Sequence, residues 1–516
     1  MSTADRPRPE RPALPPAFLI RMRTLLGERD AAELAAALER PARRGLRLQH
    51  DRIDLDALRA QVDWRLDPLP WTPHGFLVDP GDDAPGATPL HEAGAFYLQD
   101  PSAMAPAAAL AVRPGERVID LAAAPGGKAT ALAADLATEG DLPGARDGGV
   151  LVANDVHPRR VAALARNLER VGARSARVTQ ATPEAWARHA PGRFDAVLVD
   201  APCSGEGMFR KSDEARRAWS AETVAACAAR QDDLLAQAAL LLAPGGRLLY
   251  ATCTFAPEEN EAVVAALLRR RPDLRLATLR IAGTEPGLPA AAGADGLSAE
   301  GWARIWPQRA PGDGHVLALL ERDPAAPPVE AALGDLGRTA PDRPRGRARR
   351  DRRGTRDGAE RPSTPETRAA WWAFARDAAP GLPEVPDAAL VEQGGVLWLR
   401  AGGDELAGLP SLRPGLALGR PQGGRWIPSH ALAQALRPGE ARARLALPAA
   451  GDAARAWLSG EEPDPERLRQ QGAELHGDPP EDGWTQVVVA GCGVGWARVD
   501  GRRVRNLYPK GLRRSG

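Results

Sequence analysis

The feature that most constrains the fold is an alternation of short apolar runs with helical stretches between about residues 111 and 322. The apolar runs include RVIDLA, GVLVAND, FDAVLVD and GRLLYATC. Stretches such as PRRVAALARNLERVG and AETVAACAARQDDLLAQAALLLA separate them and have the composition of helices. Alternating strands and helices are typical of a parallel sheet covered by helices. We therefore predict an α/β fold, with GHVLALLER (314–322) as a late strand.

The segments on either side of this region have different patterns. Residues 13–60 carry helical periodicity, which predicts two or three small helices. Residues 323–366 include DRPRGRARRDRRGTRD, a composition that predicts a disordered linker whose arginines add phosphate contacts. Short alternating runs after it predict a small β-rich, barrel-like domain. The expected division is an N-terminal region 1–110, an α/β domain 111–322, a linker 323–366 and a C-terminal domain 367–516.

Composition excludes several classes of protein. The 516-residue chain has a net charge of +1, so nucleic-acid affinity has to come from local patches. No apolar run reaches the roughly 18 residues of a membrane span, and the N-terminus lacks the apolar segment of a signal peptide. We expect a cytoplasmic protein, monomeric by default. The cysteines form no C-x-x-C pair and the histidines no H-x-x-x-H pair, so neither a disulfide framework nor a metal site is expected.

A glycine-rich turn follows the first strand of the α/β region. VIDLAAAPGGKAT (118–130) has the strand–turn–helix form of a nucleotide-type cofactor site, but it lacks the G-x-G-x-x-G dinucleotide fingerprint. Asp155 ends the next strand, where a carboxylate can bind the hydroxyl pair of a ribose. These two features leave S-adenosylmethionine and NAD both open.

Lysine is rare in this chain. Only three of its 68 basic residues are lysine, namely Lys128, Lys211 and Lys510. Where arginine is so strongly favoured, a retained lysine indicates a place that needs a compact ammonium group. Lys128 lies in the glycine turn, and the other two lie in motif-like segments.

Two cysteines come directly after predicted strands. Cys203 follows FDAVLVD and Cys253 follows GRLLYAT. Ligands of open α/β sheets bind beyond the C-terminal ends of the strands, so both thiols are expected to flank one crevice with the glycine turn. Cys227, in a predicted helix, and Cys492, in a predicted strand, are expected to be buried small hydrophobes.

A thiol beside a methyl donor suggests chemistry at C5 of cytosine. A thiolate that adds to C6 makes C5 nucleophilic toward the methyl group, and a base then removes the C5 proton so that the thiolate can leave. Asp200 is placed to hold the N3/N4 edge of the base, and Lys128 to orient that carboxylate. Pro257 is expected to start a helix whose dipole favours a thiolate at Cys253. The adjacent residues Glu258 and Glu259 oppose this effect.

The motifs IDLAAAPGGKA, FDAVLVDAPCSGEGMFRK and LLYATCTFAPEENEAVV, preceded by YLQDPSAM, resemble those of the NOL/NOP/Sun-domain RNA (cytosine-5) methyltransferases over roughly residues 90–322. The resemblance implies a Rossmann-like, S-adenosylmethionine-dependent methyltransferase sheet. It also implies that Cys253 is the nucleophile and that Cys203 assists breakdown of the covalent adduct. DNA cytosine methyltransferases use the Pro-Cys thiol instead, and the presence of both cysteines favours the RNA family.

The resemblance also implies a set of cofactor contacts. The residues expected to contact S-adenosylmethionine are Ala122, Ala123, Ala124, Pro125, Gly126, Gly127, Lys128, Asp155, Arg160 and Asp200. The family usually has an acidic residue near the adenine, whereas VTQATPEAW offers only Gln180 to Thr182 at this place.

The terminal regions resemble parts of the bacterial RsmF-type enzymes, which modify small-subunit (16S) ribosomal RNA. The N-terminal LPPAFLIRMRTLLG resembles a small RNA-contacting region, and GWARVDGRRVRNLYPKGLRR resembles a PUA-like C-terminal domain. Tyr508 is a candidate for stacking on a base, and Lys510 for a phosphate contact. The expected partner is RNA and not DNA. Alternatives are a transfer RNA substrate, a catalytically idle ribosome-assembly factor and a NAD-dependent oxidoreductase.

Overall fold

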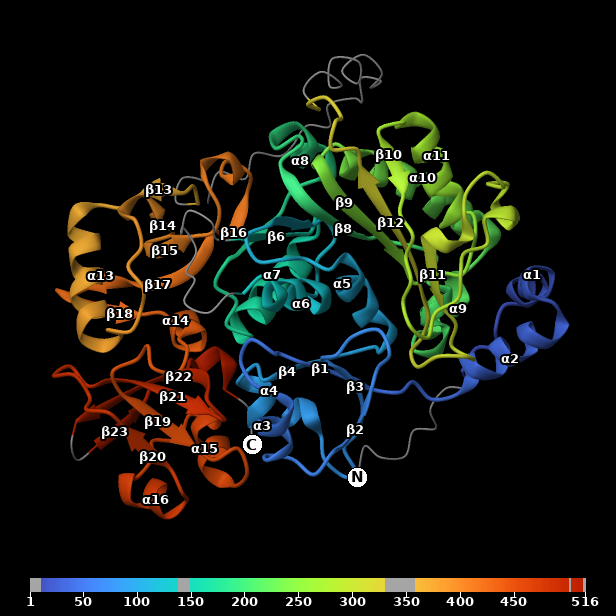
Figure 1. Ribbon diagram of the computed structural model, residues 1–516. Helices are drawn as coiled ribbons and strands as arrows, with labels where there is room; N and C mark the ends of the chain where they lie inside the picture. Colours follow the sequence, from blue (N-terminus) through green and yellow to red (C-terminus); the bar gives the residue numbers. More distant parts are fainter. Residues whose placement is uncertain (1–10, 138–148, 330–357, 501–502, 514–516) are drawn as a thin grey trace, which may run out of the picture.

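The computed structural model describes residues 11–137, 149–329, 358–500 and 503–513 (Figure 1). Most of the expected linker, residues 330–357, lies outside this range. Its last residues, 358–366, already belong to the C-terminal region, because Arg361 and Pro362 form a strand and Pro365 begins a helix. No helix among the described residues is both long and apolar enough to cross a membrane.

The α/β region forms the predicted sheet. Its five central strands are parallel and stand in the order β9 (Leu242–Thr252), β8 (Phe194–Asp200), β5 (Arg117–Asp120), β6 (Val150–Asn154) and β7 (Ala176–Thr179). The edges are antiparallel, which the alternation of strands and helices did not predict. The strand β12 (His315–Arg322) pairs with β9 and carries β10 (Leu274–Leu276) and β11 (Trp302–Ile305). At the other edge, β16 (Ser411–Arg413) pairs with β7.

Helices cover both faces of this sheet (Figure 1). Neighbouring strand residues point to opposite faces, so Val118 packs in one apolar cluster and Ile119 in the other. The first cluster contains α5 (Ala105–Leu110), α6 (Gly127–Asp135) and α7 (Pro158–Arg170). The second contains α8 (Pro183–His189), α10 (Ala221–Ala239) and α11 (Glu261–Arg270). The long apolar runs of the sequence follow from this burial on two sides.

The N-terminal region has the predicted helices and also a sheet that the sequence did not indicate. The helices α1 (Pro16–Leu26) and α2 (Glu28–Glu39) pack near α9 (Asp213–Ala218), against Phe209 and Trp219. The sheet is antiparallel, in the order β2 (Arg65–Pro68), β3 (Gly75–Asp79), β1 (Gly45–Leu48) and β4 (Phe96–Gln99). Two short helices, α3 (Leu55–Arg59) and α4 (Pro89–Glu92), complete the region.

The C-terminal region contains two five-stranded sheets, where the sequence predicted one small barrel-like domain. The first consists of β13 (Arg361–Pro362), β14 (Leu390–Gln393), β15 (Val396–Arg400), β17 (Gly415–Gln422) and β18 (Arg425–Pro428), with α13 (Pro365–Ala378). The second consists of β20 (Glu474–His476), β19 (Arg444–Leu447), β21 (Trp484–Val489), β22 (Cys492–Asp500) and β23 (Arg503–Asn506). Three helices accompany them, namely α14 (His430–Ala435), α15 (Asp452–Ser459) and α16 (Pro465–Gln470).

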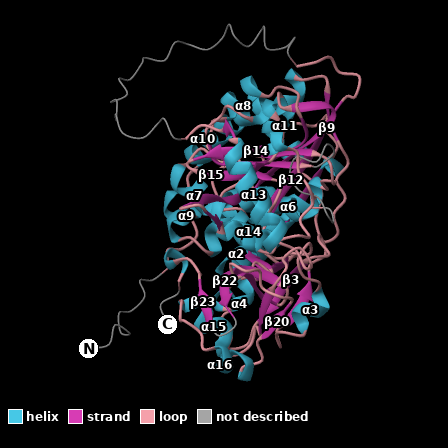
Figure 2. Ribbon diagram, turned by 90° about the vertical axis from the view of Figure 1, so that its left-hand side faces the viewer, coloured by secondary structure: helices cyan, strands magenta, loops and turns pink. Residues whose placement is uncertain are grey.

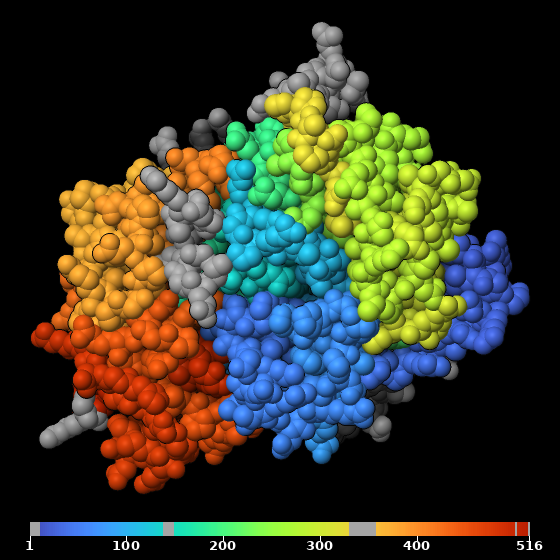
Figure 3. Space-filling model, in the orientation of Figure 1, coloured from blue at the N-terminus to red at the C-terminus, as the bar shows by residue number. Residues whose placement is uncertain are grey.

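The N-terminal, α/β and C-terminal regions are joined by a common apolar cluster and by a buried ion pair. Leu46 of the N-terminal sheet and Val487 of the last sheet belong to one apolar cluster, and α15 of the C-terminal region contacts α4 of the N-terminal region, as Figure 2 also shows. The side chain of Arg174, in the loop between α7 and β7, is only 7% exposed and pairs with Glu440. In Figure 3 the blue N-terminal segment therefore lies directly against both the red C-terminal end and the yellow-green part of the chain.

Candidate active site

A cavity of about 410 Å³ lies beyond the C-terminal ends of β8 and β9. All four residues predicted to carry chemistry line it, namely Lys128, Asp200, Cys203 and Cys253. Ala122 and Arg160 of the predicted cofactor set line it as well. The strand ends thus bring together residues that are far apart in the sequence.

The two thiols are in contact. The sulfur of Cys203 lies 3.3 Å from the sulfur of Cys253, and both cysteines are free. The hydrogen bond to Cys253, together with burial, raises the pKa of Cys203 well above its ordinary value. Cys203 is therefore a thiol at neutral pH, able to donate a proton to its neighbour. Cys227 and Cys492 are buried, as predicted.

Lys128 and Asp200 form an ion pair beside the thiols. The Lys128 Nζ atom lies 2.7 Å from Asp200 Oδ2. Burial disfavours the ammonium group, yet the Asp200 carboxylate raises the pKa of Lys128 overall. Lys128 occupies the second position of α6, which follows the glycine turn, and it fixes one oxygen of the carboxylate at the cavity wall.

A buried carboxylate ties together the two loops that carry the cysteines. Glu259 accepts a hydrogen bond of 2.9 Å from the Ser204 backbone and a short one from the Ser204 hydroxyl. The same hydroxyl lies 2.9 Å from Thr254 Oγ1. Ser204 and Thr254 each follow a cysteine in the sequence, so this network holds the two sulfurs at contact distance.

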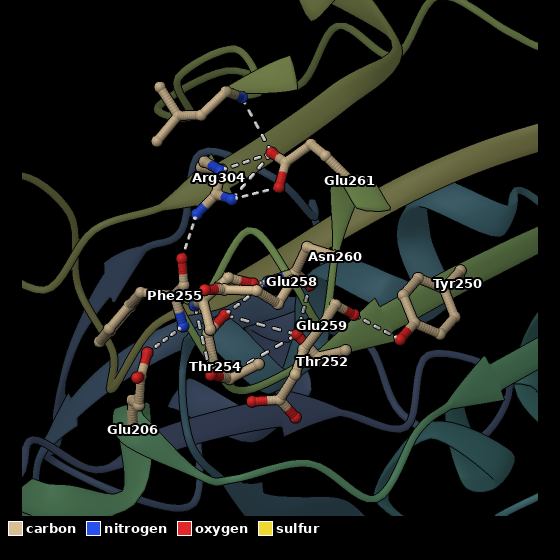
Figure 4. A network of polar contacts seen from close by, with 12 residues as sticks. Glu206, Tyr250, Thr252, Thr254, Phe255, Glu258, Glu259, Asn260, Glu261 and Arg304 are labelled. Carbon is tan, nitrogen blue, oxygen red and sulfur yellow. Dashed lines mark hydrogen bonds and ion pairs between the residues drawn. The ribbon is translucent and has the colours of Figure 1, made fainter. Parts of the chain in front are cut away.

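A second buried carboxylate, that of Glu206, supports the Cys253 loop (Figure 4). It accepts the Phe255 backbone N–H at 2.8 Å and the Trp219 indole N–H at 3.0 Å. Burial raises the pKa of Glu206 to about 7. Farther from the cavity, Arg304 and Glu261 form a fully buried ion pair, and Arg304 also donates to the Phe255 carbonyl oxygen at 3.0 Å.

The helix expected to start at Pro257 starts four residues later. Residues 257–260 form a turn, and α11 begins at Glu261. The Asn260 side chain causes this difference, because it donates to the carbonyl oxygens of Thr254 and Ala256 and accepts from the Thr252 hydroxyl (Figure 4). The predicted thiolate stabilisation by a helix beginning at Pro257 is therefore wrong.

The glycine turn is internally hydrogen-bonded. Gly126 has a φ of 117°, which favours glycine, and α6 begins at Gly127. The Asp155 carboxylate, which is 2% exposed, accepts the Ala124 backbone N–H at 3.3 Å and the His157 N–H at 2.9 Å. Arg160 pairs with this carboxylate at 3.5 Å. Asp155 and Arg160 thus fix the loop that contains Ala123 and Pro125.

Asp120, at the end of β5, was not predicted as a site residue. It is fully buried, and its Oδ2 atom has no hydrogen-bond partner among the described residues. Burial, with a contribution from Asp200, raises the pKa of Asp120 to about 7. The sequence signal was its place directly before the glycine turn.

A second polar cluster lines the cavity and was also missed. It consists of Asp100, Ser102, Asp313 and His315, with Lys211 between the two carboxylates at 3.2 Å from Asp100 Oδ2 and 2.6 Å from Asp313 Oδ2. Burial raises the pKa of Asp313 to about 6. Its sequence signals were the retained lysine and the motif YLQDPSAM, which contains Asp100 and Ser102, whereas nothing singled out Asp313 or His315 at the start of β12.

The structure places the remaining candidates outside the cavity lining. Gln180 is exposed, and its backbone N–H donates to the Pro410 carbonyl oxygen at 2.9 Å. Tyr508 is 4% exposed and packs edge-on against the His430 ring, 5.5 Å between centroids, so the prediction that it stacks on a base is wrong. Lys510 is exposed. No group of residues suited to hold a metal ion occurs in the described part of the chain.

Family models match four consecutive parts of the chain. The model described as 16S rRNA methyltransferase RsmB/F matches residues 107–321. The N-terminal domain of 16S rRNA methyltransferase RsmF matches residues 14–101. The first C-terminal domain of RsmF rRNA methyltransferase matches residues 373–436, and the methyltransferase RsmF PUA domain matches residues 445–514. The last two matches correspond to the two C-terminal sheets.

Curated relatives and solved structures agree with these matches. Ribosomal RNA small subunit methyltransferase F of Serratia proteamaculans is 36% identical over 333 residues, which are 63% of this chain and 66% of the relative. The protein of the same name from Klebsiella pneumoniae is 38% identical over 63% of this chain and 67% of the relative. The structure of a methyltransferase homolog protein from Pyrococcus horikoshii is 29% identical, with a TM-score of 0.51 over 60% of this chain and 100% of that one. The alignments thus span about two thirds of the curated relatives.

Proposed function

Because this chain belongs to the RsmB/F family of 16S rRNA methyltransferases, we propose that it transfers a methyl group from S-adenosylmethionine to C5 of a cytosine in small-subunit ribosomal RNA. The observation that carries this chemistry is the pair of free thiols, 3.3 Å apart, beside the Lys128–Asp200 ion pair. The match to an RsmF PUA domain supports an RNA partner.

The residues around the glycine turn fit S-adenosylmethionine. Asp155, the residue directly after β6, has a carboxylate of the kind that binds ribose hydroxyls, and the Oδ2 atom of buried Asp120, which has no hydrogen-bond partner among the described residues, offers an acceptor for an ammonium group. The turn before α6 and the first residues of that helix reach the cavity through Ala122 and Lys128, and Arg160, which donates to the Ala124 carbonyl oxygen, lines it as well. When bound, S-adenosylmethionine supplies an electrophilic methyl group.

The four cavity residues predicted to carry chemistry then have roles in the proposed reaction. The Cys253 thiolate adds to C6 of the cytosine, which makes C5 nucleophilic. Asp200, fixed by Lys128, holds the N3/N4 edge of the base through a charge-assisted hydrogen bond. After C5 has been methylated, its proton leaves and the Cys253–C6 bond breaks. Cys203, which is protonated and in contact with Cys253, donates a hydrogen bond to the departing sulfur.

The proposal is tested by radiolabelled methyl transfer. RNA from a strain that lacks this protein is offered both as free RNA and as ribosomal subunits, and modified positions are mapped by bisulfite sequencing. We expect 5-methylcytosine in small-subunit RNA. If only transfer RNA were labelled, methyl transfer to RNA would stand, but small-subunit RNA would be rejected as the substrate. A protein that binds S-adenosylmethionine but labels no RNA would instead be a catalytically idle assembly factor.

A further inference from the structure

The first residue of β12, His315, lies beside the candidate nucleophile. Val316 pairs with Thr252 at the end of the β9–β12 ladder, and His315 and Cys253 are the residues next to this last pair, both at the cavity. The His315 ring is 6% exposed and lines the cavity together with both thiols.

The hydrogen bonds around Ser102 determine where the His315 proton is. The Ser102 hydroxyl has a single proton, which it donates to Asp100. Its oxygen accepts the Gly314 backbone N–H at 3.2 Å and lies 3.0 Å from His315 Nδ1. Because the Ser102 hydroxyl donates its only proton to Asp100, it can only accept in its contact with His315, so Nδ1 of His315 carries the proton and donates it.

Asp100 is ionised, so it can only accept the hydrogen bond from the Ser102 hydroxyl. Its Oδ1 atom also accepts the backbone N–H groups of Ser102 at 2.9 Å and Asp313 at 3.2 Å, and its Oδ2 atom accepts from Lys211 at 3.2 Å. Four donors around one carboxylate favour its ionised form, and the pKa of Asp100 is correspondingly lowered despite its burial. Asp100 therefore accepts a hydrogen bond from the Ser102 hydroxyl and has no proton of its own to donate to it.

The neutral His315 ring consequently has a lone pair on Nε2. Among the described residues, the ring hydrogen-bonds through Nδ1 to Ser102 and also contacts the Gly314 backbone, a contact that raises its pKa against the effect of burial. Burial and the nearby Lys128 lower the pKa of His315 to about 4, so the ring stays neutral at pH 7. A fixed tautomer with a basic nitrogen at a cavity is the usual arrangement of a histidine base.

The loop before His315 fits closely against its neighbours. Gly312 has a φ of +116°, and a Cβ atom there would lie 2.6 Å from the Ser102 backbone nitrogen. Gly314 has a φ of +108°, and its Cβ would lie 2.5 Å from the Phe255 ring. Two glycines thus let the loop pack against Ser102 on one side and against the Cys253 loop on the other.

The other candidates for a base at this cavity are occupied. Cys203 is protonated and hydrogen-bonded to Cys253. The carboxylate of Asp200 pairs with Lys128. The carboxylates of Asp100 and Asp313 share Lys211. The reaction proposed above still needs an acceptor for the C5 proton.

We propose that His315 Nε2 accepts the proton from C5 of the methylated cytosine adduct, with Ser102 and Asp100 as positioning residues. This inference rests on the proposed function. The C5–H bond breaks and its electron pair forms the C5–C6 double bond. The Cys253–C6 bond breaks, and its pair returns to the sulfur. The imidazolium then releases the proton to water through the cavity.

A double-label experiment separates proton removal from methyl transfer. Single-turnover reactions use S-adenosylmethionine with a ¹⁴C-methyl group and substrate RNA with tritium at C5 of cytosine. For His315→Gln, which keeps a side-chain N–H for Ser102 but has no basic nitrogen, we expect ¹⁴C transfer within about threefold of wild type. Tritium release should be about 100-fold slower, in the range general-base catalysis contributes, and a ¹⁴C-labelled protein–RNA adduct should accumulate.

Two further variants make the result interpretable. Ser102→Ala releases Nδ1 from its acceptor and should slow tritium release less than His315→Gln does, which provides a second test if His315→Gln fails to fold. His476→Gln, a control on β20 with a side chain that is 49% exposed, should match wild type in both labels. If His315→Gln slowed ¹⁴C-methyl transfer and tritium release equally, or slowed neither, the inference would be overturned. Absence of ¹⁴C transfer by wild type would reject the proposed function itself.

Discussion

Glu259 accepts hydrogen bonds from both the backbone N–H and the hydroxyl of Ser204, and through them it joins the loop of Cys203 to the loop of Cys253. Its side chain is fully buried, whereas that of its neighbour Glu258 is 48% exposed. Two consecutive glutamates in one motif therefore have different roles. The sequence alone suggested only that both repel a thiolate.

The first prediction concerns these two glutamates. Glu259→Ala leaves the buried Ser204 and Gln231 donors without an acceptor, and each such loss costs about 1–3 kcal/mol. We expect a lower thermal midpoint and slower release of the covalent adduct, because the Cys203 loop is no longer held. Glu258→Ala is the matched control, since it removes only an exposed contact to Arg21 and should cost less than about 1 kcal/mol. Equal effects of the two substitutions would contradict this assignment.

The second prediction separates the two thiols. Cys253→Ala should abolish both methyl transfer and adduct formation, because it removes the attacking sulfur. Cys203→Ala should still form the adduct but release it slowly, so that a protein–RNA complex appears on denaturing gels. Turnover by Cys253→Ala at the wild-type rate would reject the assignment, and exchanged phenotypes would mean that the two roles are reversed.

The third prediction follows from the raised pKa of Cys203. Only a thiolate reacts with iodoacetamide, so alkylation of Cys203 should be slow at pH 7 and rise about tenfold per pH unit to beyond pH 9. The hydrogen bond to Cys253 is the largest cause of the raised pKa, so Cys253→Ala should speed alkylation of Cys203 at pH 8. Mass spectrometry of the peptide that contains Cys203 measures both rates. The same peptide in denatured protein gives the reference rate.

The sequence predicted the centre of the molecule because its signals there are local. Hydrophobic runs with helical spacers define β5, β6, β8 and β9, whereas the short β7 was not among the predicted runs. Strand ends in a parallel sheet converge, which brought Cys203 and Cys253 together correctly. The Lys128–Asp200 pair followed from the same geometry. These inferences needed only the α/β fold class and not the pairing of particular distant strands.

The missed features depend on contacts between distant segments. His315 reaches the cavity that Cys253 lines only because β12 runs antiparallel to β9, and Asp100 reaches it from the N-terminal sheet. Neither pairing leaves a periodic signal in the sequence. The start of α11 was misplaced because the Asn260 side chain competes for backbone carbonyl groups. Tyr508 is an aromatic residue in a basic segment, which predicts stacking on a base, whereas its burial against His430 depends on the packing of two C-terminal segments and has no local signal.

The last prediction concerns the attachment of the C-terminal region. Arg174 donates to Glu440 Oε1 at 2.9 Å and to the Ala435 carbonyl oxygen, and both charged side chains are at most 10% exposed. Glu440→Ala leaves a buried guanidinium without its carboxylate, which costs about 3–5 kcal/mol. We expect a clearly lower thermal midpoint and faster hydrogen exchange in α14. Asp404→Ala, which breaks a surface pair between Arg400 and an aspartate that is 91% exposed, should change stability by less than about 1 kcal/mol. The double variant Arg174→Met/Glu440→Leu should recover most of the lost stability, because it removes both charges. If Glu440→Ala destabilised the protein no more than Asp404→Ala does, the Arg174–Glu440 pair would not be what holds the C-terminal region in place.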